Sequence, residues 1–219
     1  MTSLTIDFVS DVACPWCAVG LAALEQALAR VDGEIDAELR FHPFELNPAM
    51  GPEGQDVVAY LSEKYGTTAE QQAQTRETIR QRGAEVGFSF RPEGRGRIWN
   101  TFDAHRLLHW AGQEDAAKQH RLKKALLEAY HGRAESPADA QVLLGAVAQA
   151  GLDAERARAI LAGDEFALEV RAQEQHFQRA GIHSVPAVIL NNRYLISGGQ
   201  PVAVFEDALR RIAAEAPQD

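Results

Sequence analysis

The stretch from Ser10 to Cys17 reads S-D-V-A-C-P-W-C and holds both cysteines of the chain. Before it, apolar and polar residues alternate from Leu4 to Phe8, which is the period of a β-strand. After it, apolar residues recur at helical spacing from Ala18 to Leu28. The pair is therefore predicted to lie at a strand-to-helix junction, with Cys14 at the helix start and Cys17 about one turn later.

This position favours reactive thiol chemistry. The free N–H groups and positive dipole of a helix N-terminus stabilise a thiolate. The dipole contributes about 0.3–2 kcal/mol, which lowers a thiol pKa from about 8.5 to near 7 at most. Pro15 suits the first helical position because its missing N–H would have no partner there, whereas an Asp11 carboxylate turned toward Cys14 would oppose the effect. We expect Cys14 to be the reactive, partly exposed nucleophile and Cys17 the shielded resolving thiol.

The cysteine pair has two other possible uses, as a buried structural pair or as half of a zinc site. A tetrahedral zinc site needs two further ligands, and His105 and His109, four residues apart on a predicted helix, are the candidates. A lone C-x-x-C beside a β-α-β pattern is more typical of a redox motif. We therefore predict no metal site.

Composition narrows the function classes further. The chain has 219 residues, 46% of them hydrophobic, and a formal charge of −9, which argues against binding to nucleic acid or to an anionic membrane. No run approaches the roughly 18 apolar residues of a membrane helix. The first ten residues lack the features of an export signal, so we expect a cytoplasmic protein, in which a dithiol pair is usually catalytic or redox-sensing.

The order of predicted elements indicates an α/β protein with a thioredoxin fold. Residues 1–47 form a β-α-β unit that carries the cysteines, with a parallel strand pair and a right-handed crossover. Residues 48–180 read as an all-helical insertion with a capping box from Thr67 to Glu70. Residues 181–219 form a strand hairpin around Asn191-Asn192 and a last helix. We expect a mixed four-stranded core sheet with a large helical insertion.

The chain resembles the DsbA family of thiol–disulfide oxidoreductases, in particular its cytosolic FrnE-like branch. The segments that carry the resemblance span nearly the whole chain: Ser10–Cys17, Pro43–Pro48, Asn100–Leu107, Ser184–Pro186 and Ser197–Val202. The resemblance implies that Cys14 is the nucleophile and Cys17 the resolving cysteine. It also implies that Pro186 is a cis-proline lying against the disulfide, which leaves the backbone of Val185 free to pair with an extended substrate.

Four more residues are candidate substrate contacts. Pro15 and Trp16 lie between the cysteines, and the indole is expected to offer an exposed aromatic face. Gly199 and Gln200 belong to a loop at a helix start that could offer N–H groups to a carboxylate. In related glutathione-using proteins this region approaches the glutathione chain.

The leading hypothesis is a dithiol enzyme that reduces, oxidises or isomerises disulfides of proteins or small thiols. It needs no bound cofactor, and glutathione is a candidate redox co-substrate. The first alternative is a glutathione-dependent isomerase or transferase of the hydroxychromene-carboxylate isomerase and kappa type, although those relatives usually carry serine at the position of Cys14 and lack Cys17. The second is a non-catalytic redox or zinc-binding interaction protein.

Overall fold

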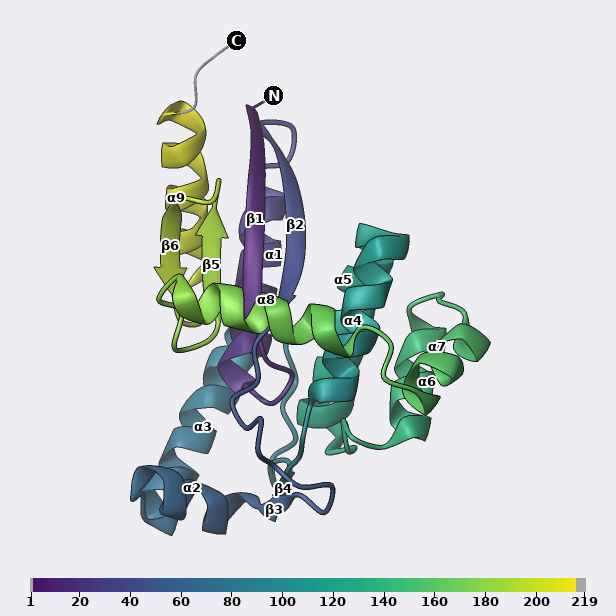
Figure 1. Ribbon diagram of the computed structural model, residues 1–219. Helices are drawn as coiled ribbons and strands as arrows, with labels where there is room; N and C mark the ends of the chain where they lie inside the picture. Colours follow the sequence, from purple (N-terminus) through teal and green to yellow (C-terminus); the bar gives the residue numbers. More distant parts are fainter. Residues whose placement is uncertain (1, 216–219) are drawn as a thin grey trace.

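A four-stranded mixed sheet forms the centre of the computed structural model, which describes residues 2–215 (Figure 1). The strand order is β2-β1-β5-β6, with β1 parallel to β2, β1 antiparallel to β5, and β5 antiparallel to β6. This confirms the predicted thioredoxin-type sheet. The strands are β1 (Thr2–Ser10), β2 (Ile35–Pro43), β5 (Ala187–Leu190) and β6 (Tyr194–Ser197).

Strand β1 is the buried strand of the sheet. It pairs with β2 from Thr2↔Ile35 to Ser10↔Pro43. Parallel neighbours require a crossover connection, and helix α1 (Pro15–Arg30) supplies it. Residues 11–14 connect the carboxyl end of β1 to the start of α1. This short segment therefore lies just beyond the end of the sheet.

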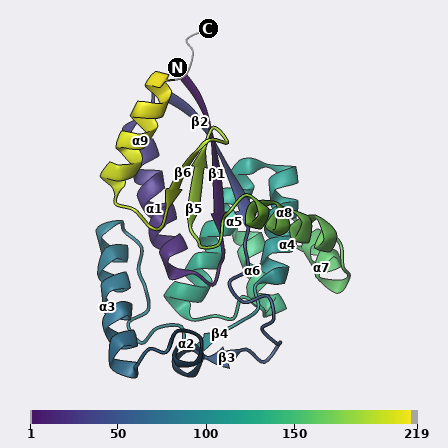
Figure 2. The same ribbon diagram turned by 60° about the vertical axis from the view of Figure 1, so that its left-hand side comes forward.

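Helices cover both faces of the sheet. Helix α1 packs against α9 (Val202–Glu215), and both lie behind the sheet in Figure 1, while α8 (Ala167–Arg179) crosses in front of it. Figure 2 shows the same layers from the side. Leu24 and Leu209 belong to one buried cluster with Phe8 and Cys17, so the cysteine pair is anchored in the main core.

The remaining helices lie between the two halves of the sheet in the sequence. They are α2 (Val57–Tyr65), α3 (Ala69–Glu85), α4 (Phe102–Glu114), α5 (Ala116–Leu127), a π-helical turn (Glu128–Gly132), α6 (Ala140–Gln149) and α7 (Ala154–Ala162). A small sheet of β3 (Gln55–Asp56) and β4 (Arg97–Ile98) joins this region. The insertion was expected to be all-helical, but residues 55–56 and 97–98 form this small sheet, and the helices that follow begin at Val57 and Phe102.

The capping box of α3 lies one residue later than predicted. The Thr68 hydroxyl accepts from the Gln71 N–H at 3.3 Å, and the Gln71 side chain accepts from the Thr68 N–H at 2.9 Å. The Thr67 hydroxyl instead donates to the carbonyl of Leu61 at 3.2 Å. Two adjacent threonines made both registers plausible, and the preceding helix decides between them.

The predicted hairpin turn is present between β5 and β6. Asn191 and Asn192 have φ values of +50° and +52°, a region that asparagine tolerates better than most residues. The Asn191 side chain also accepts from the Thr5 N–H at 3.0 Å, which fixes the turn to β1. Across residues 2–215, no helix has the length and apolar character needed to cross a bilayer.

Candidate active site

The two cysteines lie where the sequence placed them. Cys14 is the N-cap residue of α1, with extended backbone angles of φ −90° and ψ 115°, and Pro15 occupies the first helical position. The Cys17 N–H donates to the Cys14 carbonyl at 3.1 Å, so the pair spans the first helical turn. Both are free thiols.

Cys14 is more buried than predicted. Only 5% of the residue is exposed, against 0% for Cys17. The reason is the segment before β5, because the Cys14 thiol donates to the Val185 carbonyl at 3.4 Å. Cys14 is therefore only slightly more exposed than Cys17, and both lie in the buried core.

The pKa values of the two thiols move in opposite directions. The pKa of Cys14 lies below its ordinary value because the Cys17 thiol donates to its sulfur and the N–H groups of Cys17 and Trp16 face it. These contacts outweigh burial and the opposing charge of Asp11. The pKa of Cys17 is raised well above its ordinary value by burial and by the Cys14 thiolate, with the Lys123 charge acting against the rise. A lowered and a raised thiol pKa suit an attacking and a shielded cysteine.

Four of the predicted substrate-contact residues, Trp16, Val185, Pro186 and Gly199, gather beside the first turns of α1. The Val185–Pro186 peptide bond is cis. A Cβ atom on Gly20 would lie 3.1 Å from Pro186 Cγ, and one on Gly199 would lie 3.0 Å from the Trp16 carbonyl oxygen. Trp16 is half-buried and packs partly against the main core. Side chains larger than glycine at positions 20 and 199 would therefore separate these groups.

The other two predicted contacts differ from each other. Pro15 is half-buried at the start of α1. The backbone N–H of Gln200 donates to the Gly198 carbonyl at 3.0 Å, and its side-chain amide donates to the Ser197 carbonyl at 2.8 Å. Its described contacts therefore hold the turn before α9 and do not reach the cysteines.

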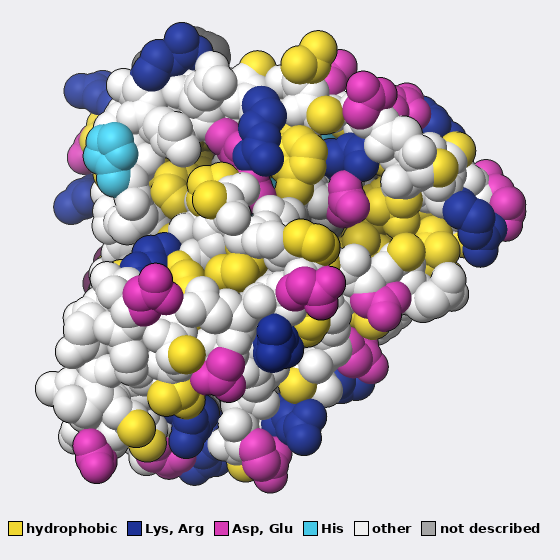
Figure 3. Space-filling model, turned by 60° about the horizontal axis from the view of Figure 1, so that its bottom comes forward, with side chains coloured by type: hydrophobic (Ala, Val, Ile, Leu, Met, Phe, Trp, Pro, Cys, Tyr) yellow, Lys and Arg dark blue, Asp and Glu magenta, His cyan; other side chains and the backbone are white. Residues whose placement is uncertain are grey.

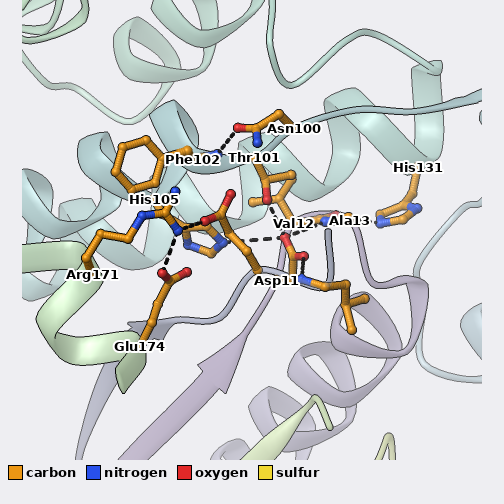
Figure 4. Close-up of polar contacts among 12 residues, drawn as sticks. Asp11, Val12, Ala13, Asn100, Thr101, Phe102, His105, His131, Arg171 and Glu174 are labelled. Carbon is orange, nitrogen blue, oxygen red and sulfur yellow. Dashed lines mark hydrogen bonds and ion pairs between the residues drawn. The ribbon is translucent and has the colours of Figure 1, made fainter. Parts of the chain in front are cut away.

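A buried carboxylate fixes the segment just before Cys14 (Figure 4). Asp11 is fully buried and accepts from the Ala13 N–H at 3.0 Å, the Leu46 N–H at 2.7 Å and the Thr101 hydroxyl at 2.8 Å. His105 Nε2 lies 3.4 Å away. Burial raises the pKa of Asp11, but the hydrogen bond and charge of His105 and the two N–H groups outweigh it, so the net pKa is lowered. The carboxylate thus links the active-site segment to the end of β2 and to α4.

A second acidic cluster lies next to this network. Arg171 of α8 pairs with Glu45 and, at 2.8 Å, with Glu174; Figure 4 shows Arg171 beside Glu174. Glu45 and Glu174 are each 5% exposed, and each has one oxygen without a hydrogen-bond partner among the described residues. Burial and the Glu174 charge raise the pKa of Glu45.

His131 and Lys123 are among the side chains of the insertion that reach the site without having been predicted from the sequence. His131 is buried, and burial lowers its pKa to about 3, so the neutral ring donates through Nε2 to the Val12 carbonyl at 2.9 Å. Lys123 of α5 is 1% exposed, and burial lowers its pKa, while the charges of Cys17, Asp11 and Cys14 act to raise it. A buried lysine that affects a thiol is characteristic of a functional site.

The structure does not assemble the alternative zinc site. The His105 ring is held by Asp11, and His109 bonds to the side chains of Gln113 and Gln173. Within residues 2–215, no group of three or more histidine, cysteine or acidic side chains is placed to hold a metal ion.

Comparison with known proteins adds a family assignment to this geometry. The model of the "DSBA-like thioredoxin domain" matches residues 5–210. A crystal structure of the probable DsbA oxidoreductase SCO1869 from Streptomyces coelicolor is 34% identical, covers 99% of this chain and 92% of its own, and superposes with a TM-score of 0.88. The uncharacterized protein YwbO from Bacillus subtilis is 26% identical and covers 93% of this chain and 94% of its own.

A 2-hydroxychromene-2-carboxylate isomerase structure is also similar, with a TM-score of 0.71 and 15% identity over 96% of this chain and 97% of its own. At that identity the likeness concerns the fold alone. The family model spans almost the full length, including both cysteines and the cis-proline segment. The chain therefore belongs to the family of DsbA-like thioredoxin-fold proteins.

Proposed function

We propose that this protein is a dithiol–disulfide oxidoreductase in which Cys14 attacks and Cys17 resolves. The Cys14 thiolate displaces one sulfur of a substrate disulfide, which forms a Cys14–substrate mixed disulfide and releases one substrate thiolate. The Cys17 thiolate then attacks the Cys14 sulfur and releases the second. The substrate gains two electrons and the protein disulfide forms; in the oxidising direction the same steps run in reverse.

The opposite pKa shifts of the two thiols are the observation that carries this proposal. A lowered pKa raises the thiolate fraction of Cys14 at any given pH, while the raised pKa of Cys17 keeps that thiol protonated until the mixed disulfide removes the Cys14 charge beside it. That order of events prevents Cys17 from competing for the substrate.

Substrates approach through the face that carries Cys14 and the Val185–Pro186 segment. Figure 3 turns the lower end of Figure 1 forward and shows hydrophobic side chains interspersed with charged ones. Such a surface suits disulfides of protein segments as well as small thiols. Val185 is the backbone position at which an extended substrate would pair, because it lies beside the nucleophile: the Cys14 thiol donates to its carbonyl at 3.4 Å. Action in the cytoplasm, with glutathione as redox co-substrate, is part of the proposal.

The test is a comparison of Cys17→Ala and Cys14→Ala with the wild type. The pre-reduced proteins are mixed with a disulfide, quenched in acid and analysed by mass. The wild type should become internally oxidised, Cys17→Ala should accumulate a mixed disulfide at Cys14, and Cys14→Ala should remain unreacted. Multiple-turnover disulfide reduction that is unchanged in Cys17→Ala would contradict the proposal and favour a glutathione-dependent isomerase, which has no need of the second cysteine.

A further inference from the structure

A single arginine of the insertion contacts the backbone next to the nucleophile. Arg95 Nη1 donates to the carbonyl of Ala13, the residue before Cys14. The guanidinium carbon lies 5.4 Å from the centroid of the Tyr130 ring, and the Tyr130 hydroxyl donates to the Arg97 carbonyl at 2.7 Å. Arg95 is therefore held between the active-site segment and a buried aromatic ring, while the residue itself stays half-exposed.

The loop that carries Arg95 is built for this position. Gly94 and Gly96 on either side have φ values of +81° and +74°, which glycine adopts without steric cost. The Val57 N–H donates to the Gly96 carbonyl at 3.0 Å, and the next residue, Arg97, pairs with Asp56 in the small sheet. These contacts fix the backbone of the loop from which the Arg95 side chain extends.

Most of the hydrogen-bonding capacity of Arg95 is unused. A guanidinium carries several N–H donors, and contacts within residues 2–215 use one of them. No carboxylate in that range lies within ion-pair distance of Arg95, whereas Arg91 in the same loop pairs with Glu93 at 3.2 Å. The carboxylate of Asp11 is occupied by Ala13, Leu46 and Thr101. A half-exposed guanidinium with free donors is suited to a carboxylate of a bound ligand.

The residue that Arg95 contacts is the direct neighbour of the nucleophile in the chain, because Ala13 precedes Cys14 and its carbonyl accepts from Arg95. Arg95 therefore adds a positive charge on the Ala13 side of Cys14. A substrate disulfide that carries a carboxylate would be attracted to this charge.

We propose that Arg95 is a carboxylate-binding residue that makes the site selective for small acidic disulfides of the glutathione type. The inference rests on the proposed oxidoreductase function and names its substrate class. In the reaction, glutathione disulfide accepts two electrons and leaves as two glutathione thiols, while Cys14 and Cys17 become a disulfide.

The experiment measures the rate at which pre-reduced protein is oxidised by glutathione disulfide and by uncharged bis(2-hydroxyethyl) disulfide. The variants are Arg95→Gln, which removes the charge, and Arg95→Lys, which keeps the charge without the planar fork. Arg91→Gln is the matched control, because it removes an exposed charge from the same loop.

Arg95→Gln should slow oxidation by glutathione disulfide about 10-fold or more, as expected for loss of a charge-assisted pair, with the uncharged disulfide affected by less than about 2-fold. Arg95→Lys should be intermediate, and Arg91→Gln should resemble the wild type. For the wild type, added salt should slow the acidic substrate more than the uncharged one.

Equal losses with both disulfides, or no loss with either, would overturn the inference, because Arg95 would then act only on the Ala13 backbone or not at all. Those outcomes leave the proposed function intact. Failure of the wild type to react with either disulfide would instead refute the oxidoreductase itself.

Discussion

Replacement of Asp11 by asparagine tests how the site is held together. The carboxylate is fully buried and accepts three hydrogen bonds of 3.0 Å or less, from Ala13, Leu46 and Thr101. An asparagine amide offers one oxygen and one NH₂ group. If the oxygen serves Ala13 and Thr101, the NH₂ group faces the Leu46 N–H, and neither has an acceptor.

An unsatisfied buried donor costs about 1–3 kcal/mol, and loss of a charged acceptor weakens the remaining bonds. We therefore expect Asp11→Asn to lower the free energy of unfolding by about 2–4 kcal/mol near neutral pH. Thr101→Val, which removes one hydroxyl donor and keeps the side-chain shape, should cost about 1 kcal/mol.

The loss should depend on pH in a defined direction. The pKa of Asp11 is lowered in the folded protein from an ordinary value of 3.8. A depressed carboxyl pKa contributes stability above the ordinary value, and this contribution is lost as the pH falls through the folded pKa. The difference between wild type and Asp11→Asn should therefore be full near neutral pH and should shrink in acid.

Denaturant unfolding at several pH values measures both effects. The reasoning is refuted if Asp11→Asn is as stable as the wild type near neutral pH, or if the difference stays constant into acid. A second readout is independent of stability. Because the Asp11 charge raises the pKa of Cys14, Asp11→Asn should lower that pKa further, which is measurable by thiol alkylation.

Three other substitutions have defined outcomes. Lys123→Met removes a charge that lowers the pKa of Cys17, so resolution of the mixed disulfide by Cys17 should slow in rapid-quench kinetics. The free energy of unfolding, measured by denaturation, should rise by about 1 kcal/mol because the Lys123 ammonium no longer has to be desolvated. Glu45→Gln should flatten the stability profile, since a raised carboxyl pKa gives stability that is complete below the ordinary value of 4.5 and is lost as the pH rises through the folded value; an unchanged slope in pH-dependent unfolding would contradict this. Gly20→Val places a branched side chain where a Cβ already lies 3.1 Å from Pro186 Cγ, so it should cost about 1–3 kcal/mol and slow oxidation of the protein by disulfides, with equal rates counting against the packing described.

Local patterns were sufficient to predict the centre of the fold. Alternation in β1, a proline after Cys14 and an asparagine pair at the hairpin each depend on neighbours in the sequence, and each is present in the structure. The small sheet of β3 and β4 was missed because two-residue strands have no measurable period. The exposure of Cys14 was overestimated because its cover, Val185, comes from a distant segment.

Lys123 shows where a signal was present but unused. The residues three, four and seven positions later, Leu126, Leu127 and Tyr130, are all buried, so Lys123 lies in the apolar stripe of its helix. A lysine in such a stripe is a candidate buried charge. Arg95 has no comparable signal, because its contact with Ala13 depends on how the insertion packs against the active-site segment.

The most direct test of the central claim is the pH dependence of alkylation at each cysteine. The fully reduced protein is treated with iodoacetamide over a range of pH, and the modified cysteine is located by mass spectrometry. The account predicts modification at Cys14 with a midpoint below the ordinary thiol pKa of about 8.5, while Cys17 stays unmodified in the folded protein. Modification of Cys17 first, or a Cys14 midpoint at or above that value, would contradict it.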